Sequence, residues 1–106
     1  MNNAEYKLLN TLINGYFHPD WDADYDTEAE VVDQYIRTTW RDDVERSIEQ
    51  IDRYLSDHPA GLLAAFNADF APMFIIGQND AEARAFLLDV RDQFRAHIDL
   101  APLRPV

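Results

Sequence analysis

Apolar side chains recur three and four positions apart along most of the chain, the spacing that places them on one face of an α-helix. This pattern predicts a first amphipathic helix over residues 4–17. The His18-Pro19 pair should end it, because proline disfavours helical backbone angles in the residue before it. The expected buried face of this helix consists of Leu8, Leu9, Leu12, Ile13 and Tyr16.

Two capping boxes predict where later helices begin. Thr27 is followed three positions later by Glu30, and Asn79 by Glu82. The side chains of each pair can accept hydrogen bonds from backbone amides that have no partner within the first helical turn. The first pair opens a helix with an expected apolar face of Val31, Val32, Tyr35, Ile36 and Trp40. The second opens a helix to about residue 97, with a buried face of Ala83, Phe86, Leu87, Val90 and Phe94.

Two further helices are predicted between these. One covers residues 42–56 after a turn at residues 39–41, and the other covers residues 61–68. Residues 70–77 are expected to form a buried connector or a helical turn, since no second segment offers a strand to pair with them.

The composition agrees with one small helical domain. The chain has 106 residues with three glycines and five prolines, and 47% of it is hydrophobic. We therefore expect a single domain over residues 1–106, folded as an all-α bundle of about four to five helices. The end of the chain, which contains Pro102 and Pro105, should fray.

Composition also bears on the chemistry and the location of the protein. The absence of cysteine excludes disulfides, thiolate zinc sites and thiol nucleophiles, and it suits a reducing compartment. We find neither a secretory signal pattern nor an apolar run near the roughly 20 residues that a membrane span needs. We expect a cytoplasmic protein that does not bind membranes.

The charge balance favours one class of partner over another. Twenty acidic residues against nine basic ones give a net charge of -11. Such a surface repels phosphate backbones, which argues against direct binding of nucleic acid. It attracts a basic protein, whose association rate should fall as salt is added.

Negative charge is densest between positions 20 and 33, where seven acidic residues stand without a lysine or arginine among them. A calcium-binding loop is one interpretation, and it needs glycine at its sixth position and an acid at its twelfth. Counting from Asp20 gives Tyr25 and Val31, and counting from Asp22 gives Thr27 and Asp33. Neither register has the glycine, so the spacing disfavours calcium.

Two other interpretations of this segment stay open and are compatible. It can be a solvated loop whose aromatic residues fold it onto the bundle. It can also be a protein-binding face, in which acids steer a basic partner and aromatic side chains anchor it. The candidate partner-binding residues are Asp20, Trp21, Asp22, Asp24, Tyr25, Asp26, Glu28 and Glu30.

The sequence predicts no catalytic, cofactor-binding or metal site. His18, His58 and His97 are scattered and lack the spacing of a helical metal-binding pair. Ser47 and Ser56 lack the context of a nucleophile elbow, and the chain has no glycine-rich phosphate loop. We expect a protein that is not an enzyme and that uses no cofactor.

One block of the chain resembles a known family. Asn14-Gly15-Tyr16 ends the first predicted helix, Phe17-His18-Pro19-Asp20-Trp21 follows, and acids then lead into the helix capped by Thr27. This arrangement is similar to a Tyr-Phe-His-x-Asp-Trp signature in one family of CdiI immunity proteins of bacterial contact-dependent growth inhibition systems. The resemblance is most specific over residues 8–36, and Pro19 stands where that signature favours a polar residue such as glutamine.

The resemblance implies a cytoplasmic, non-catalytic inhibitor that binds the C-terminal toxin domain of a cognate CdiA protein. Many such toxin domains are nucleases, often acting on transfer RNA. Because the signature is shared while toxins differ, it implies that Phe17, His18, Asp20 and Trp21 hold the fold. We expect a monomer when free and a one-to-one complex with the toxin. The alternative is a small acidic regulatory or adaptor protein that binds a basic host protein.

Overall fold

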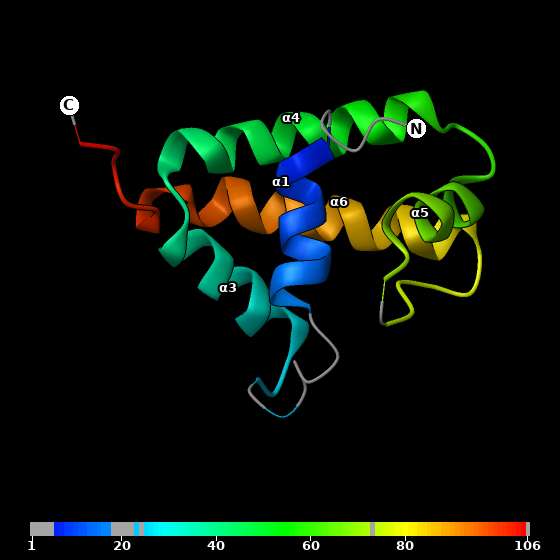
Figure 1. The fold of residues 1–106 in the computed structure, drawn as a ribbon, viewed down its shortest axis with the longest axis horizontal. Coiled ribbons are helices and arrows are strands. Elements are labelled where there is room, and N and C mark those ends of the chain that lie inside the picture. Colours follow the sequence, from blue (N-terminus) through cyan, green and yellow to red (C-terminus); the bar gives the residue numbers. More distant parts are fainter. Residues whose placement is uncertain (1–5, 18–22, 24, 73, 106) are drawn as a thin grey trace.

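The helix α6 (Asp80–His97) forms the centre of a small bundle in the computed structural model, which describes residues 6–17, 23, 25–72 and 74–105. It contacts α3, α4 and α5, and α4 in turn contacts α1 (Figure 1). The surrounding helices are α1 (Lys7–Asn10), α3 (Glu28–Thr38), α4 (Arg41–Asp57) and α5 (Leu62–Phe70). The described residues form no strand, and the predicted all-α bundle is confirmed.

The first helix begins as α1 and continues directly into a π-helical segment, η2 (Thr11–Tyr16). The wider turns are visible at its end, where the Phe17 amide donates to the Leu12 carbonyl, five residues earlier, at 3.0 Å. Asn14 then links this segment to α5, because its side-chain amide donates to the Phe70 carbonyl at 2.9 Å. The predicted helix is therefore confirmed over its described part.

Both predicted capping boxes lie at helix starts. The Thr27 hydroxyl accepts from the Glu30 amide at 3.2 Å, and the Asn79 side chain accepts from the Glu82 amide at 2.9 Å. The predicted turn between α3 and α4 is also confirmed, because Thr39 has extended backbone angles.

The start of α5 is capped by a residue of another helix. The Asp80 carboxylate, at the first position of α6, accepts from the Gly61 amide at 3.0 Å and from the Leu63 amide at 2.9 Å. A carboxylate at this position also faces the positive end of the α5 dipole. Asp80 thus fixes the relative position of α5 and α6, which the capping signals along the chain do not reveal.

The connector between α5 and α6 is only partly buried. Ile76 lies in the core with 6% exposure, and Phe74 stacks on Phe17 with a centroid distance of 4.7 Å. Ile75, however, is 73% exposed. The expectation of a buried connector therefore holds for Ile76, holds in part for the half-buried Phe74 and is wrong for Ile75.

The end of the chain is fixed on α4, so the prediction of a frayed tail is wrong for its described residues. The Arg41 amide donates to the Pro102 carbonyl at 2.8 Å. Arg104 pairs with Asp42 at 3.1 Å and with Asp43 at 2.9 Å. These contacts join residues about sixty positions apart, which a local pattern cannot anticipate.

Trp40 also departs from its predicted place on a buried face. Because α3 ends at Thr38, Trp40 is the residue that precedes α4, and its side chain is 38% exposed. The guanidinium of Arg104 lies 5.5 Å from the centroid of its ring, a cation–π arrangement.

Glycine at position 77 is required by a close approach of the connector to α6. A Cβ added there would lie 2.7 Å from the Glu82 Cβ and 2.8 Å from the Ala83 amide nitrogen. We expect Gly77→Ala to lower the free energy of unfolding by about 1–3 kcal/mol through overpacking. Gly15→Ala is the matched control: its Cβ would make an ordinary 3.7 Å contact in a helix, so a gain of roughly 0.5–1 kcal/mol is expected. Urea denaturation measures both, and equal effects would contradict the packing argument.

Candidate protein-binding surface

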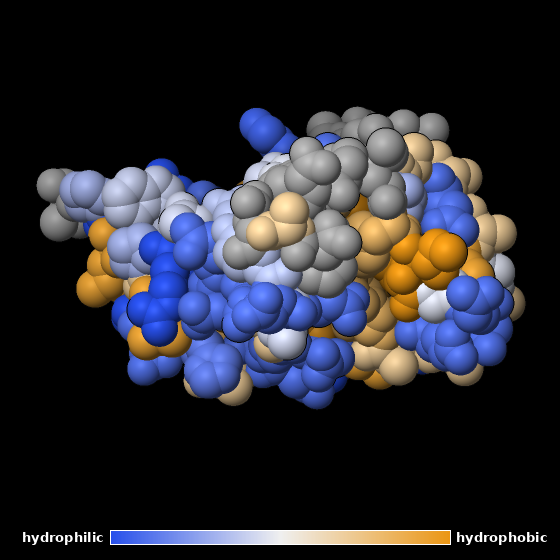
Figure 2. Space-filling view, turned by 90° about the horizontal axis from the view of Figure 1, so that it is seen from below, coloured by the Kyte–Doolittle hydropathy of each residue, from blue (hydrophilic) through white to orange (hydrophobic). Residues whose placement is uncertain are grey.

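Five described acidic residues lie on or just before α3 and in the middle of α6, and we call this group the acidic face. Figure 2 shows hydrophilic residues over the underside of the bundle, with an apolar area toward the end that holds α5. The acidic face consists of Asp26, Glu28, Glu30, Asp33 and Asp89.

Half of the sequence-predicted binding residues can be placed on the structure. Tyr25, Asp26, Glu28 and Glu30 are described, whereas His18 and the remaining four candidates lie outside the described residues. Those four are Asp20, Trp21, Asp22 and Asp24. Tyr25 is half-buried and packs against the core, while the three acids are exposed.

Glu30 has a local role in addition to its charge. Its carboxylate accepts from the Asp26 amide at 2.9 Å, and its own amide donates to the Thr27 hydroxyl at 3.2 Å. These two bonds order the turn that leads into α3 and hold Asp26 beside the helix start. A carboxylate at that end also stabilises the helix through its dipole.

Glu28 and Asp89 place two negative charges across the junction of α3 and α6. Partial desolvation at this junction, together with repulsion from Asp89, raises the pKa of the Glu28 carboxyl above its ordinary value. The Asp89 carboxylate accepts from the Gln93 side chain at 2.8 Å, a bond that leaves its charge intact. The fold therefore holds two like charges near one another, and no ion pair between described residues involves Glu28 or Asp89.

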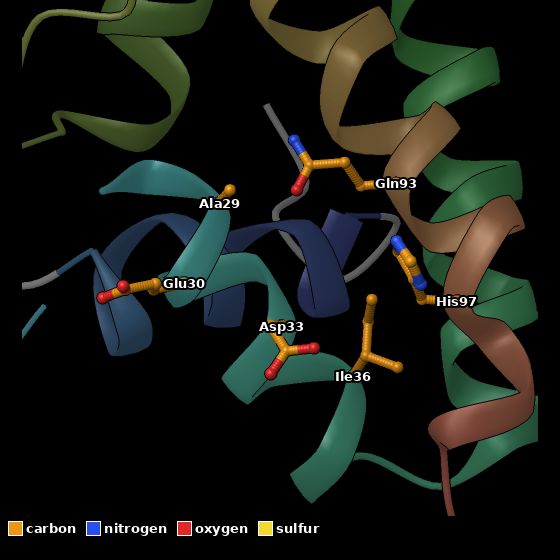
Figure 3. A pocket seen from close by; sticks show the side chains of 6 residues that line it. All are labelled: Ala29, Glu30, Asp33, Ile36, Gln93 and His97. Carbon is orange, nitrogen blue, oxygen red and sulfur yellow. The ribbon is translucent and has the colours of Figure 1, made fainter. Parts of the chain in front are cut away.

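A groove of about 240 Å³ lies between α3 and α6 on this face. Figure 3 shows that Gln93 and His97 of α6 reach toward the side of α3 that carries Ile36, while the Glu30 carboxylate points away from α6. The groove is lined by Ala29, Glu30, Asp33, Ile36, Gln93 and His97.

One cation of the chain already contacts this groove. The Arg37 guanidinium pairs with the Asp33 carboxylate at 2.8 Å, and their side chains are 54% and 45% exposed. An exposed pair one helical turn apart contributes only a few tenths of a kcal/mol, so it holds Asp33 weakly.

Sequence reasoning missed the α6 side of this surface. Asp89, Gln93 and His97 stand four positions apart, and this spacing places them on one face of the helix. That polar stripe was a signal in the sequence, but only the packing of α6 on α3 shows that it meets the acids of the second capped helix.

The described residues show no group of three or more histidine, aspartate or glutamate side chains placed to hold a metal ion. The calcium-loop interpretation begins at Asp20 or Asp22, which fall outside the described part of the chain. Within that part, no helix is both long and apolar enough to cross a membrane.

A family of proteins described as CdiI immunity protein matches residues 5–94. The chain belongs to this family. The resemblance inferred from the Phe17 block is therefore confirmed, over a longer stretch than the block itself. No curated protein and no solved structure gives a significant match to the chain.

Phe17 is the one residue of this CdiI family member's Phe17, His18, Asp20 and Trp21 set that the structure describes, and it is fully buried. Its ring stacks on Phe74 at 4.7 Å and meets Phe86 edge-on at 5.9 Å. It therefore joins the end of the first helix to the connector and to α6. This environment agrees with the expectation that Phe17 holds the fold.

The raised pKa of Glu28 predicts a specific pH dependence of stability. A carboxyl with a higher pKa in the folded chain binds protons more readily there, so its ionisation destabilises the fold. This loss sets in as the pH rises past the ordinary value of 4.5 and is complete above the raised value. We expect Glu28→Gln to raise the melting temperature at pH 7 and to have a smaller effect below pH 4.5.

Asp89→Asn provides the control for this effect, because it removes the repulsion and keeps the Glu28 carboxyl. It should make the effect of Glu28→Gln at pH 7 smaller. Thermal unfolding of the four chains between pH 4 and pH 8 measures the coupling. Additive shifts of the melting temperature would contradict the assigned role of Asp89.

Proposed function

We propose that this CdiI family member binds the C-terminal toxin domain of its cognate CdiA protein and neutralises it in a one-to-one complex. The single observation that carries the proposal is the family match over residues 5–94. The acidic face adds a physical reason for the complex, because it holds like charges together and so favours a partner of opposite charge.

The proposed toxin domain is a nuclease with a basic substrate-binding surface. Nucleases bind phosphate backbones through lysine and arginine, and an acidic protein competes for the same cations. The net charge of -11 suits that competition. On this proposal the immunity protein acts in the cytoplasm as a monomer, without catalysis of its own and without contacting nucleic acid.

Inhibition in this proposal is stoichiometric. A complex that is to silence a toxin must have a slow dissociation rate, and buried aromatic and arginine anchors supply most of the binding energy in such interfaces. The acidic residues would act mainly on the rate of encounter.

The test is co-expression with the C-terminal toxin domain that is encoded beside this chain's gene. We expect cells that carry both chains to grow, and a one-to-one complex to co-purify at physiological salt. Toxin activity on RNA or DNA substrates should fall linearly with added immunity protein and reach zero near one equivalent. Growth arrest in the presence of soluble immunity protein would overturn the proposal.

A further inference from the structure

The groove between α3 and α6 has the chemistry to hold one long cationic side chain. Its apolar lining comes from Ala29, which is exposed, and from Ile36, which is buried, and its α3 rim carries the Asp33 carboxylate. Gln93 and His97 form the α6 wall (Figure 3). A volume of about 240 Å³ suits a single side chain rather than a segment of peptide.

Arginine matches these features better than other side chains. Its methylene stem can lie on the apolar lining while its charged head reaches the rim. Its planar guanidinium forms forked hydrogen bonds with carboxylates and stacks on flat rings, and the groove offers both Asp33 and the His97 imidazole. A lysine ammonium would be attracted by the Asp33 charge but could neither form a forked hydrogen bond nor stack on the His97 ring.

Electrostatics around the groove point in the same direction. Glu28 and Asp89 flank the α3–α6 junction and repel one another. Both charges would attract a cation of a partner that approaches the groove. Arg37 is the only described cation paired with Asp33, and this exposed pair can be exchanged at little cost.

We propose that the α3–α6 groove receives an arginine side chain of the toxin domain and anchors the complex there. This inference rests on the proposed function, and it names the site and the side chain through which that function operates. The acidic face then steers the partner, while the groove determines how long it stays bound.

The decisive variant fills the groove without changing the charge. Ala29→Trp places an indole over the apolar lining at a position that is exposed on α3, so the helix itself should fold normally. Ala64→Trp is the matched control, an identical change at an exposed position of α5. With the wild-type toxin domain as the probe, we expect Ala29→Trp to weaken binding by about 30-fold or more, mainly through faster dissociation. Ala64→Trp should stay within about two-fold of the wild-type chain.

A second pair of variants covers the case in which Ala29→Trp fails to fold. Asp33→Asn removes the rim charge at constant size, and Glu45→Gln removes one charge from the exposed surface of α4. Both change the net charge equally, so a larger loss of affinity in the Asp33 variant reports the position of that charge at the groove. We expect the Asp33 variant to bind about ten-fold more weakly and the Glu45 variant to bind almost as tightly as the wild-type chain.

The outcomes separate the two proposals. If the wild-type chain does not bind the toxin domain, the proposed function fails and the groove proposal fails with it. If the wild-type chain binds tightly but the groove variants match their controls, the groove proposal is overturned and the proposed function stands. A loss confined to Ala29→Trp and Asp33→Asn supports both.

Discussion

Phe17→Ala is expected to lower the free energy of unfolding by about 3–5 kcal/mol, the cost of emptying a buried aromatic site. Phe17 is fully buried and contacts Phe74 and Phe86, so its loss leaves a cavity between three segments that are distant in sequence. A domain of this size is typically stable by about 5–15 kcal/mol, so the variant should retain a fold with a clearly lower urea midpoint.

A control variant and a binding measurement test whether Phe17 acts through stability alone. Ile75→Ala removes an apolar side chain that is 73% exposed, and its effect should stay within about 0.5 kcal/mol. At a temperature where the Phe17 variant is still folded, its affinity for the toxin domain should equal that of the wild-type chain. Weaker binding by a fully folded variant would show that Phe17 acts in the interface.

The starts of α3 and α6 could be predicted from the sequence because local chemistry fixes them. In the Thr27–Glu30 and Asn79–Glu82 pairs, the first side chain accepts a hydrogen bond from the backbone amide of the second residue. Residues three positions apart therefore determine where each helix begins. The apolar periodicity likewise predicts which face of each helix is buried. No pattern in the sequence predicted that residues 11–16 form π-helical rather than α-helical turns.

The features that sequence reasoning missed depend on contacts between distant segments. Arg104 contacts Asp42 and Trp40, and these contacts hold the described end of the chain against the start of α4. The groove arises in the same way, because the residues of its two walls are more than fifty positions apart in the sequence. The sequence shows the polar residues of each wall, but only the packing of α6 on α3 brings them together.

The acidic residues of this chain divide into two groups by what they contact. Asp52, Asp42 and Asp43 pair with arginines, and Asp80 caps a helix, so their charges contribute to the fold. Glu28 and Asp89 instead repel one another across α3 and α6. Net charge alone does not separate these groups, and the repulsion between Glu28 and Asp89 favours a partner of opposite charge.

Raising the salt concentration from about 20 mM to about 500 mM should slow association with the toxin domain by roughly ten- to a hundred-fold. The reason is that the acidic face attracts the approaching partner over a distance set by the Debye length, which added ions shorten. Dissociation breaks short contacts that salt screens less, so its rate should change by about three-fold or less. Stopped-flow fluorescence or surface-based kinetics over a series of salt concentrations measures both rates.

The position of the steering charges follows from a matched pair of double variants. Asp26→Asn with Glu28→Gln removes two charges from the acidic face, and Glu45→Gln with Glu49→Gln removes two from the exposed side of α4. Because the field at the docking surface is strongest near its own charges, the first pair should flatten the salt dependence of association more than the second. Equal flattening would mean that total charge alone guides the encounter. Association that does not respond to salt in the wild-type complex would remove the electrostatic basis for an acidic binding face.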